Sequence, residues 1–290
     1  MATGRRRLLG LLAATAATTA AAIPAQAQPR RDAPPEIVDP RASRFVFGPE
    51  GRQWRILVGL PDAPPPPQGY SAILSLDGAA TFPRLWRHRE ERAPRSPVIL
   101  FAVDYEGANR RWYDLTSRAM KPIAPILFYR AAPADRLTGG REAFLAMIEN
   151  DLLPELARRH PLNRDDMTIY GHSLGGLFVV HALLSRPGLF ARYSAADPSV
   201  WWNAGESQRE AVAFAAGVRA AGGTIRPGIG LMVAQAGRAR RNHPHDPTAL
   251  VRALTGLGGL DVRYRPYPDD DHGSLVEPST ADTLDWHLGR

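Results

Sequence analysis

Two kinds of apolar pattern alternate along most of this chain. Short apolar runs are typical of strands, and longer segments with apolar residues every three or four positions are typical of helices. The short runs predict strands over residues 53–60, 71–76, 97–103, 167–170, 193–196, 229–235 and 262–267. The longer pattern predicts helices over residues 140–160, 174–184, 208–221, 248–254 and 281–288.

This order of elements predicts the fold class. Strands separated by helices indicate right-handed crossovers and an α/β fold, with a mostly parallel twisted sheet covered by helices on both faces. The run over 97–103 is apolar throughout, as expected for a strand buried on both sides. The first two or three strands have no predicted helix between them, so we expect them to pair antiparallel. One domain over residues 44–290 accounts for all of these elements.

The amino terminus has the features of an export signal. Arginines at 5–7 precede a weakly apolar stretch over 8–23, and the small residues at 25–27 resemble a cleavage site. We therefore expect residues 1–27 to be removed and the mature protein to be periplasmic or secreted. The paired arginines favour twin-arginine export. An uncleaved membrane anchor is disfavoured because the stretch is short and rich in Ala and Thr. The proline-rich residues 28–43 predict a flexible segment.

Composition narrows the function classes. The 290 residues are 44% hydrophobic, enough for a full core, and the absence of cysteine excludes disulfides, thiolate metal sites and cysteine nucleophiles. The net charge of +7 comes from arginines that are scattered along the chain, which argues against a nucleic-acid partner. One group, Arg238, Arg240 and Arg241, follows a predicted strand. It is either a solvated loop or the rim of an anion-binding site, with Arg238 as a substrate contact.

A predicted strand, the sequence Gly-His-Ser-Leu-Gly-Gly at 171–176 and a predicted helix follow one another directly. This is the context of a nucleophile elbow, in which a serine occupies a strained turn and the flanking glycines let strand and helix approach. The alternative, an incidental Gly-Ser turn, does not need that context. Ser173 is therefore the predicted nucleophile, and the Leu174 amide is a predicted oxyanion donor.

A serine nucleophile needs a base, which in this kind of fold lies after the last strand. His272 follows the strand over 262–267 and precedes Gly273. We expect His272 to take the serine proton. The other histidines lie too early in the chain, on the terminal helix or beside the elbow: His243, His245, His287, His172 and His181.

The acid that would orient the base is not evident. No carboxylate directly follows the strand over 229–235, and the first one available is Asp246. Because Pro247 comes next, Asp246 also fits a helix cap. Asp246 is thus a tentative catalytic acid, with Asp197 as the second choice. A Ser–His dyad without an acid stays open.

Several other residues have expected places around the site. Gly78 and Ala79 follow a predicted strand and offer backbone amides for the oxyanion. Trp201 and Trp202 either stack against an aromatic substrate or anchor the core. His243, His245 and Asp246 resemble metal ligands, but nothing nearby completes a coordination shell, so we expect neither a metal nor a cofactor.

Six motifs in this order resemble one known family. They are Asp77-Gly78, Arg111-Trp-Tyr-Asp114, the segment 139–144, the elbow from Tyr170, Pro198-Ser-Val-Trp-Trp202 and Asp271-His-Gly-Ser274. Over residues 44–290 the chain resembles the esterase D-like family of α/β-hydrolases, especially the periplasmic siderophore trilactone esterases. The resemblance implies hydrolysis of serine-trilactone catecholate siderophores, with ferric catecholates among the candidate substrates, by Ser173 and His272. Some members of that subgroup act as dyads, and Asp197 stands where a small residue is more usual.

The sequence therefore predicts a monomeric, cofactor-free serine carboxylic-ester hydrolase that acts on a small-molecule ester, with no membrane association after signal cleavage. Two alternatives remain. One is an esterase or thioesterase for another small ester, and the other is a non-catalytic binding protein on a hydrolase scaffold.

Overall fold

The computed structural model describes residues 37–120, 136–237 and 245–290. Its strands are β1 (Ala42–Phe47), β2 (Trp54–Gly59), β3 (Tyr70–Leu76), β4 (Val98–Tyr105), β5 (Leu162–His172), β6 (Arg192–Ala196), β7 (Thr224–Ala236) and β8 (Gly258–Tyr267). Its helices are α1 (Gly78–Arg92), α2 (Arg111–Asp114), α3 (Arg141–Met147), the π-helical turn η1 (Ile148–Leu152), α4 (Leu153–Arg159), α5 (Leu174–Ser185), α6 (Glu206–Ala220), α7 (Pro247–Leu254) and α8 (Val276–His287).

The strands form one eight-stranded sheet in the order β1-β2-β4-β3-β5-β6-β7-β8. β1 pairs antiparallel with β2, and β2 antiparallel with β4, whereas every later pair is parallel. The carboxyl ends of the parallel strands therefore meet at one edge of the sheet, where α/β proteins bind ligands.

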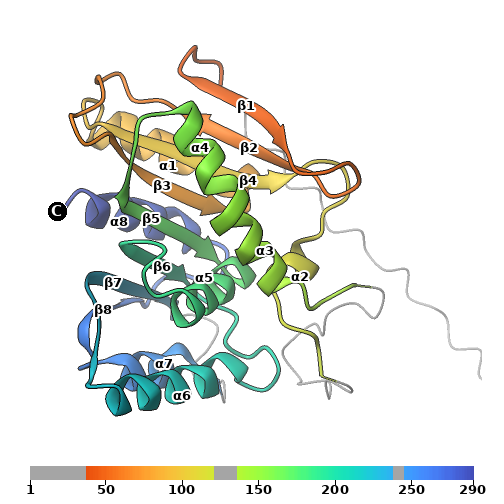
Figure 1. Ribbon diagram of the computed structural model, residues 1–290, viewed down its shortest axis with the longest axis vertical. Helices are drawn as coiled ribbons and strands as arrows, with labels where there is room; N and C mark the ends of the chain where they lie inside the picture. Colours follow the sequence, from red (N-terminus) through yellow and green to blue (C-terminus); the bar gives the residue numbers. More distant parts are fainter. Residues whose placement is uncertain (1–36, 121–135, 238–244) are drawn as a thin grey trace, which may run out of the picture. The chain divides into compact units, whose positions relative to one another are not determined.

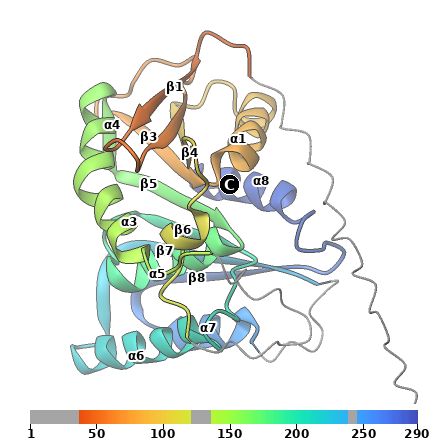
Figure 2. The same cartoon turned by 90° about the vertical axis from the view of Figure 1, so that its right-hand side faces the viewer.

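Helices cover both faces of the sheet. α1 and α8 lie on one face, and α3, α4 and α5 lie on the other, with α6 and α7 beside β7 and β8 (Figures 1 and 2). Each face has its own apolar core. Phe82, Leu85 and Trp86 of α1 pack with Leu284 of α8 in one, and α5 contributes Phe178 to the larger one.

The predicted α/β architecture is confirmed, and all seven predicted strands are present. The strand β1 and the helix α1 were not predicted. α1 is rich in Arg and His, which obscures the spacing of its buried Phe82, Leu85 and Trp86. One of its arginines, Arg89, is fully buried and donates to the carbonyl oxygens of Gly59 and Val98.

Two finer expectations need correction. β2 does not pair with β3. The helix α1, which was not predicted, connects β3 to β4 as a parallel crossover unit, and β4 is the strand that pairs with β2. The helix expected over 140–160 is interrupted by η1, so its four-residue spacing does not continue as one α-helix.

The predicted signal segment, residues 1–27, lies outside the described residues, as does most of the predicted flexible segment. Among the helices of the described ranges, none is both long enough and apolar enough to span a bilayer.

Candidate active site

Ser173 stands on a sharp turn between β5 and α5. Its backbone has φ 62°, a left-handed conformation that is rare for a residue other than glycine. A Cβ atom on Gly171 would lie 2.4 Å from the backbone of Gly175, and one on Gly176 would lie 2.9 Å from the Ala196 carbonyl oxygen. Both positions therefore require glycine, as expected for a nucleophile elbow. The turn is fixed further by a 2.9 Å hydrogen bond from the Ser173 amide to the Ala196 carbonyl oxygen.

His272 lies against this serine from a loop that follows β8. Its Nε2 is 2.9 Å from the Ser173 Oγ, the distance of a good hydrogen bond. The neighbouring Asp271 carboxylate holds the loop by accepting from the backbone amides of Gly273 and Ser274, at 2.8 and 2.9 Å. The structure thus brings together the two residues that the sequence predicted as nucleophile and base.

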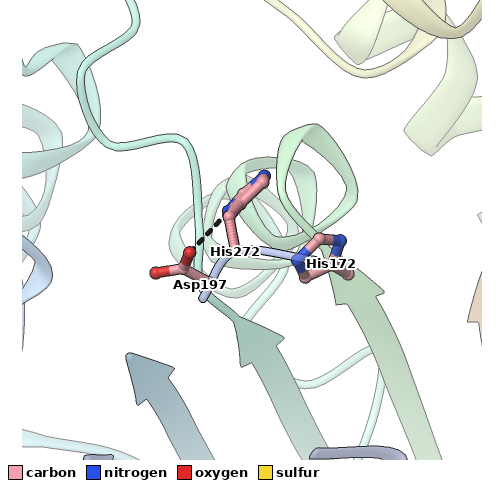
Figure 3. Close-up of side chains that lie close together, drawn as sticks. All are labelled: His172, Asp197 and His272. Atoms are coloured by element: carbon pink, nitrogen blue, oxygen red, sulfur yellow. Dashed lines mark hydrogen bonds and ion pairs between the residues drawn. The ribbon is translucent and has the colours of Figure 1, made fainter. Parts of the chain in front are cut away.

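Asp197 completes a chain of three side chains. Its Oδ2 lies 2.5 Å from the His272 Nδ1 (Figure 3), and the side chain is fully buried. The other carboxylate oxygen, Oδ1, accepts from the Ala236 amide at 3.3 Å. Asp197 directly follows β6 and has φ 40°, a conformation that Asp adopts more readily than most residues. The strand β6 pairs with β5 so that Ala196 lies opposite His172, which places the next residue of each strand side by side.

The tentative assignment of Asp246 as the acid needs correction. Asp246 is the N-cap of α7, and its Oδ1 accepts from the Thr248 amide at 2.7 Å and from the Thr248 hydroxyl. The capping role, which its position before Pro247 indicated, accounts for this carboxylate. The carboxylate at His272 is that of Asp197, because β6 and not β7 is the strand next to the elbow strand.

The predicted oxyanion donors differ in their surroundings. Leu174 is the first residue of α5, so its amide has no carbonyl within the helix to bind. Burial raises the pKa of the Asp104 carboxyl, which lies close to the start of α1. Gly78 packs closely on β4, since a Cβ there would lie 3.1 Å from the Asp104 Cβ. The assignment of Gly78 and Ala79 as oxyanion donors stays a prediction.

Arg111, at the start of α2, was not among the predicted site residues. Its Nε donates to the Asp77 Oδ1 at 2.7 Å, and its Nη2 lies 3.3 Å from the His172 carbonyl oxygen, one residue before the nucleophile. Asp77 itself lies between β3 and α1 in a left-handed conformation, φ 56°. Both residues stand in motifs of the family resemblance, but only the folded chain brings Arg111 to the elbow.

The histidine beside the nucleophile is held neutral. The His172 ring lies 4.5 Å from the His272 ring, centroid to centroid. Burial lowers the pKa of His172 to about 3, and the nearby charges of His272 and Arg111 act in the same direction. Burial also lowers the pKa values of His181 and His287, to about 3 and about 4. These three rings are packing groups, as the sequence suggested for His172 and His181.

The tryptophans expected near the substrate are part of the core. Trp202 is fully buried and its indole N–H donates to the Ser117 Oγ at 2.9 Å, while Trp201 is 8% exposed. Their rings pack against each other at 5.9 Å, centroid to centroid. The anchoring alternative therefore fits both residues better than the stacking one. Arg238 and its neighbours, the predicted anionic rim, lie outside the described residues.

His172, Asp197 and His272 are close enough together to suggest metal ligands, with one ligand atom of each within 4.8 Å of the others. The hydrogen bond between Asp197 and His272 and the one between His272 and Ser173 explain this proximity without an ion. His245, from the other ligand-like group, lies with its Nδ1 3.3 Å from the Gln208 side chain. The expectation that the protein uses no metal or cofactor stays a prediction.

A serine, a histidine and an aspartate linked in this way are the arrangement of an acyl-transfer site. Residues 50–242 match the model of the Esterase family, which is described as “Putative esterase”. The chain belongs to this family. The matched region of the Esterase family includes Ser173, Asp197 and Arg111 and ends before His272.

Curated relatives and solved structures agree with this family. The ferri-bacillibactin esterase BesA of Bacillus subtilis is 35% identical over 53% of this chain and 56% of its own length. This chain thus matches little more than half of that relative. A siderophore enterobactin esterase of Emericella nidulans is 28% identical over 73% of the chain and 80% of its own length. The crystal structure of the BES protein from Bacillus cereus covers 87% of this chain and 98% of its own, with a TM-score of 0.70 and 23% identity, and so supports the fold.

Proposed function

We propose that this protein is a serine carboxylic-ester hydrolase that cleaves serine-trilactone catecholate siderophores. The observation that carries the proposal is the continuous hydrogen-bonded chain from Asp197 through His272 to Ser173 at the elbow. A serine hydroxyl is a weak nucleophile at neutral pH, and a base held 2.9 Å away by a buried carboxylate is what activates it.

In the proposed reaction, Ser173 attacks the ester carbonyl carbon while the His272 Nε2 takes the hydroxyl proton. Asp197 keeps the Nδ1 proton of His272 in place and stabilises the imidazolium that forms. The imidazolium then gives its proton to the leaving alcohol as the acyl-enzyme forms. A water molecule, activated by the same imidazole, hydrolyses the acyl-enzyme and restores Ser173.

The negative charge that develops on the carbonyl oxygen needs fixed donors. The Leu174 amide at the start of α5 is one of them. We infer that the Arg111 guanidinium is the second, because its ion pair with Asp77 and its hydrogen bond to the His172 carbonyl oxygen fix its position beside the elbow. Gly78 and Ala79 remain candidates for a further donor. Preorganised charges of this kind cost no reorganisation during the reaction.

The substrate class is inferred from the names of the relatives. BesA is named for a ferri-bacillibactin ester, and the Emericella nidulans relative for enterobactin. Together with the site, these names favour a siderophore ester over another small ester or a thioester. A non-catalytic binding protein would not need a fully buried carboxylate behind His272.

The site of action follows from the amino terminus. Residues 1–27 have the pattern of an export signal, so we infer that the mature protein is periplasmic or secreted and meets its substrate there as a monomer.

Two assays on the mature protein test the proposal. The first measures hydrolysis of enterobactin, iron-free and iron-loaded, against p-nitrophenyl acetate and an acetyl thioester. The second measures labelling by a fluorophosphonate, which reacts with an activated serine. We expect trilactone hydrolysis and labelling in the wild type, and loss of both in Ser173→Ala. Labelling without trilactone hydrolysis would favour the other esterases, and no labelling at all would favour the binding protein.

A further inference from the structure

A cavity of about 410 Å³ lies against helix α2, within the size range of small-molecule sites. Its walls include three arginines and two aromatic residues: Arg52, Arg110, Arg136, Trp112 and Tyr113. None of its described lining residues is acidic. The function proposed above makes no use of these five side chains.

The cavity carries a net positive charge. Arg52 and Arg136 are exposed to solvent, and Arg110 is half-buried with its guanidinium 4.9 Å from the centre of the Trp54 ring. Arg110 forms an ion pair with Asp114, whose Oδ2 lies 3.7 Å from the Arg110 Nη2, beyond hydrogen-bond distance. That carboxylate accepts instead from the Trp54 indole N–H at 3.0 Å. The described lining thus holds three guanidinium groups and no carboxylate, and Asp114 offsets part of the charge of Arg110 from outside the lining.

The aromatic walls are held in place by packing. The Trp112 ring lies 6.0 Å from the buried Trp202 ring, centroid to centroid. Tyr113 packs on Gly140 so closely that a Cβ there would lie 2.4 Å from the Tyr113 ring. Fixed aromatic rings stack on planar ligands, and guanidinium groups bind anionic oxygens in the same plane. Such walls favour a ligand that is flat, aromatic and negatively charged.

Helix α2 links the cavity to the candidate active site. Arg110 and Trp112 flank Arg111 in the sequence, and Arg111 lies against the carbonyl oxygen of His172. Helix α2 lies beyond the carboxyl end of β4, on the side of the sheet where β5 ends (Figure 1). A ligand with its ester at Ser173 can therefore extend towards these arginines.

We propose that this cavity binds one dihydroxybenzoyl arm of a ferric catecholate, with Arg52, Arg110 and Arg136 against its anionic oxygens. The inference rests on the proposed esterase function and adds the residues that contact one arm of the substrate. A ferric tris-catecholate has a net negative charge, whereas a ferric tris-hydroxamate is uncharged. The enzyme should thus select iron-loaded catecholate esters over iron-loaded hydroxamate esters.

The kinetic test compares two double variants with the same change in charge. Arg52→Gln/Arg136→Gln removes two cations of the cavity, and Arg95→Gln/Arg219→Gln removes two exposed arginines elsewhere. We expect the first to raise KM for ferric enterobactin by about tenfold, with kcat changed less than about twofold. It should also lower the selectivity for ferric enterobactin over an uncharged ferric hydroxamate ester about tenfold. The second double variant should leave this selectivity unchanged. Equal effects of both variants, or none in the first, would overturn the proposal.

A binding measurement separates this proposal from the proposed reaction. Calorimetry on Ser173→Ala with ferric tris(2,3-dihydroxybenzoate) needs no catalysis. We expect binding in that variant and an affinity about tenfold weaker when Arg52→Gln/Arg136→Gln is added. Absent binding, or affinity unchanged by the double substitution, would exclude the cavity as this site. If the wild type binds this complex but does not hydrolyse the ester, the result counts against the proposed esterase function and not against the cavity as a binding site.

Discussion

The Asp197 Oδ2 lies 2.5 Å from the His272 Nδ1, although the two residues are 75 positions apart in the sequence. Asp197 comes from the end of β6, the strand beside the elbow strand, and the Ala236 amide at the end of β7 binds its second oxygen. The carboxylate is thereby buried, oriented and directed at the base. This relationship favours a triad over the dyad that the sequence left open.

The first prediction concerns the Arg111 guanidinium. Arg111→Gln removes the charge at the elbow, so we expect kcat to fall by roughly 10²- to 10³-fold with a smaller change in KM. Arg111→Lys keeps a charge but loses the planar fork to Asp77 and His172, and should retain more activity than Gln. Steady-state kinetics of the two variants check this. Full activity in Arg111→Gln would remove the guanidinium from the mechanism.

The second prediction concerns Asp246 as a helix cap. Asp246→Ala should lower the free energy of unfolding by about 1 kcal/mol, because the Thr248 amide loses its acceptor. Asp246→Asn should cost little, since Asn caps about as well. Urea denaturation measures both, and kcat should stay near the wild-type value in each. A large loss of kcat in Asp246→Asn would restore this residue as a candidate acid.

The third prediction concerns stability and pH. His287 is buried between the Thr168 and Ser71 hydroxyls, and burial lowers its pKa to about 4. In the unfolded chain His287 takes up a proton below the usual histidine pKa of 6.5. In the folded chain the ring stays neutral until about pH 4. The unfolded state thus binds more protons in this window, and stability falls as the pH falls through it.

For this one residue the loss between pH 7.5 and pH 5 should be on the order of 1–2 kcal/mol. Thermal or urea unfolding at the two pH values measures it in the wild type and in His287→Gln. The variant, which has no titrating ring, should lose less stability on acidification. An equal loss in both proteins would mean that His287 does not contribute.

The parts of the site that the sequence revealed are those set by local structure. The elbow around Ser173 needs a strand, flanking glycines and a helix in immediate succession, all visible as a pattern. The loop with His272 follows directly from the last predicted strand. Even the cap at Asp246 was evident from Pro247. Each of these depends on neighbours in the chain.

The parts that it missed, or in the case of Asp197 placed second, depend on which strands lie side by side. Asp197 reaches His272 because β6 pairs with β5, and nothing near residue 197 encodes that pairing. Arg111 reaches the elbow across the sheet edge for the same reason. The helix α1 escaped prediction because its buried apolar residues lie among arginines and histidines, including the buried Arg89.

The kcat of Asp197→Asn tests the account most directly. Asn tolerates the left-handed backbone of this position as Asp does, so the variant should fold with its main chain unchanged. An amide cannot stabilise the imidazolium and lets the His272 ring adopt the wrong tautomer. We predict that kcat for ester hydrolysis falls by about 10³- to 10⁴-fold, while Asp246→Asn stays near wild type. A kcat within a few-fold of wild type in Asp197→Asn would contradict the triad and show that Ser173 and His272 act as a dyad.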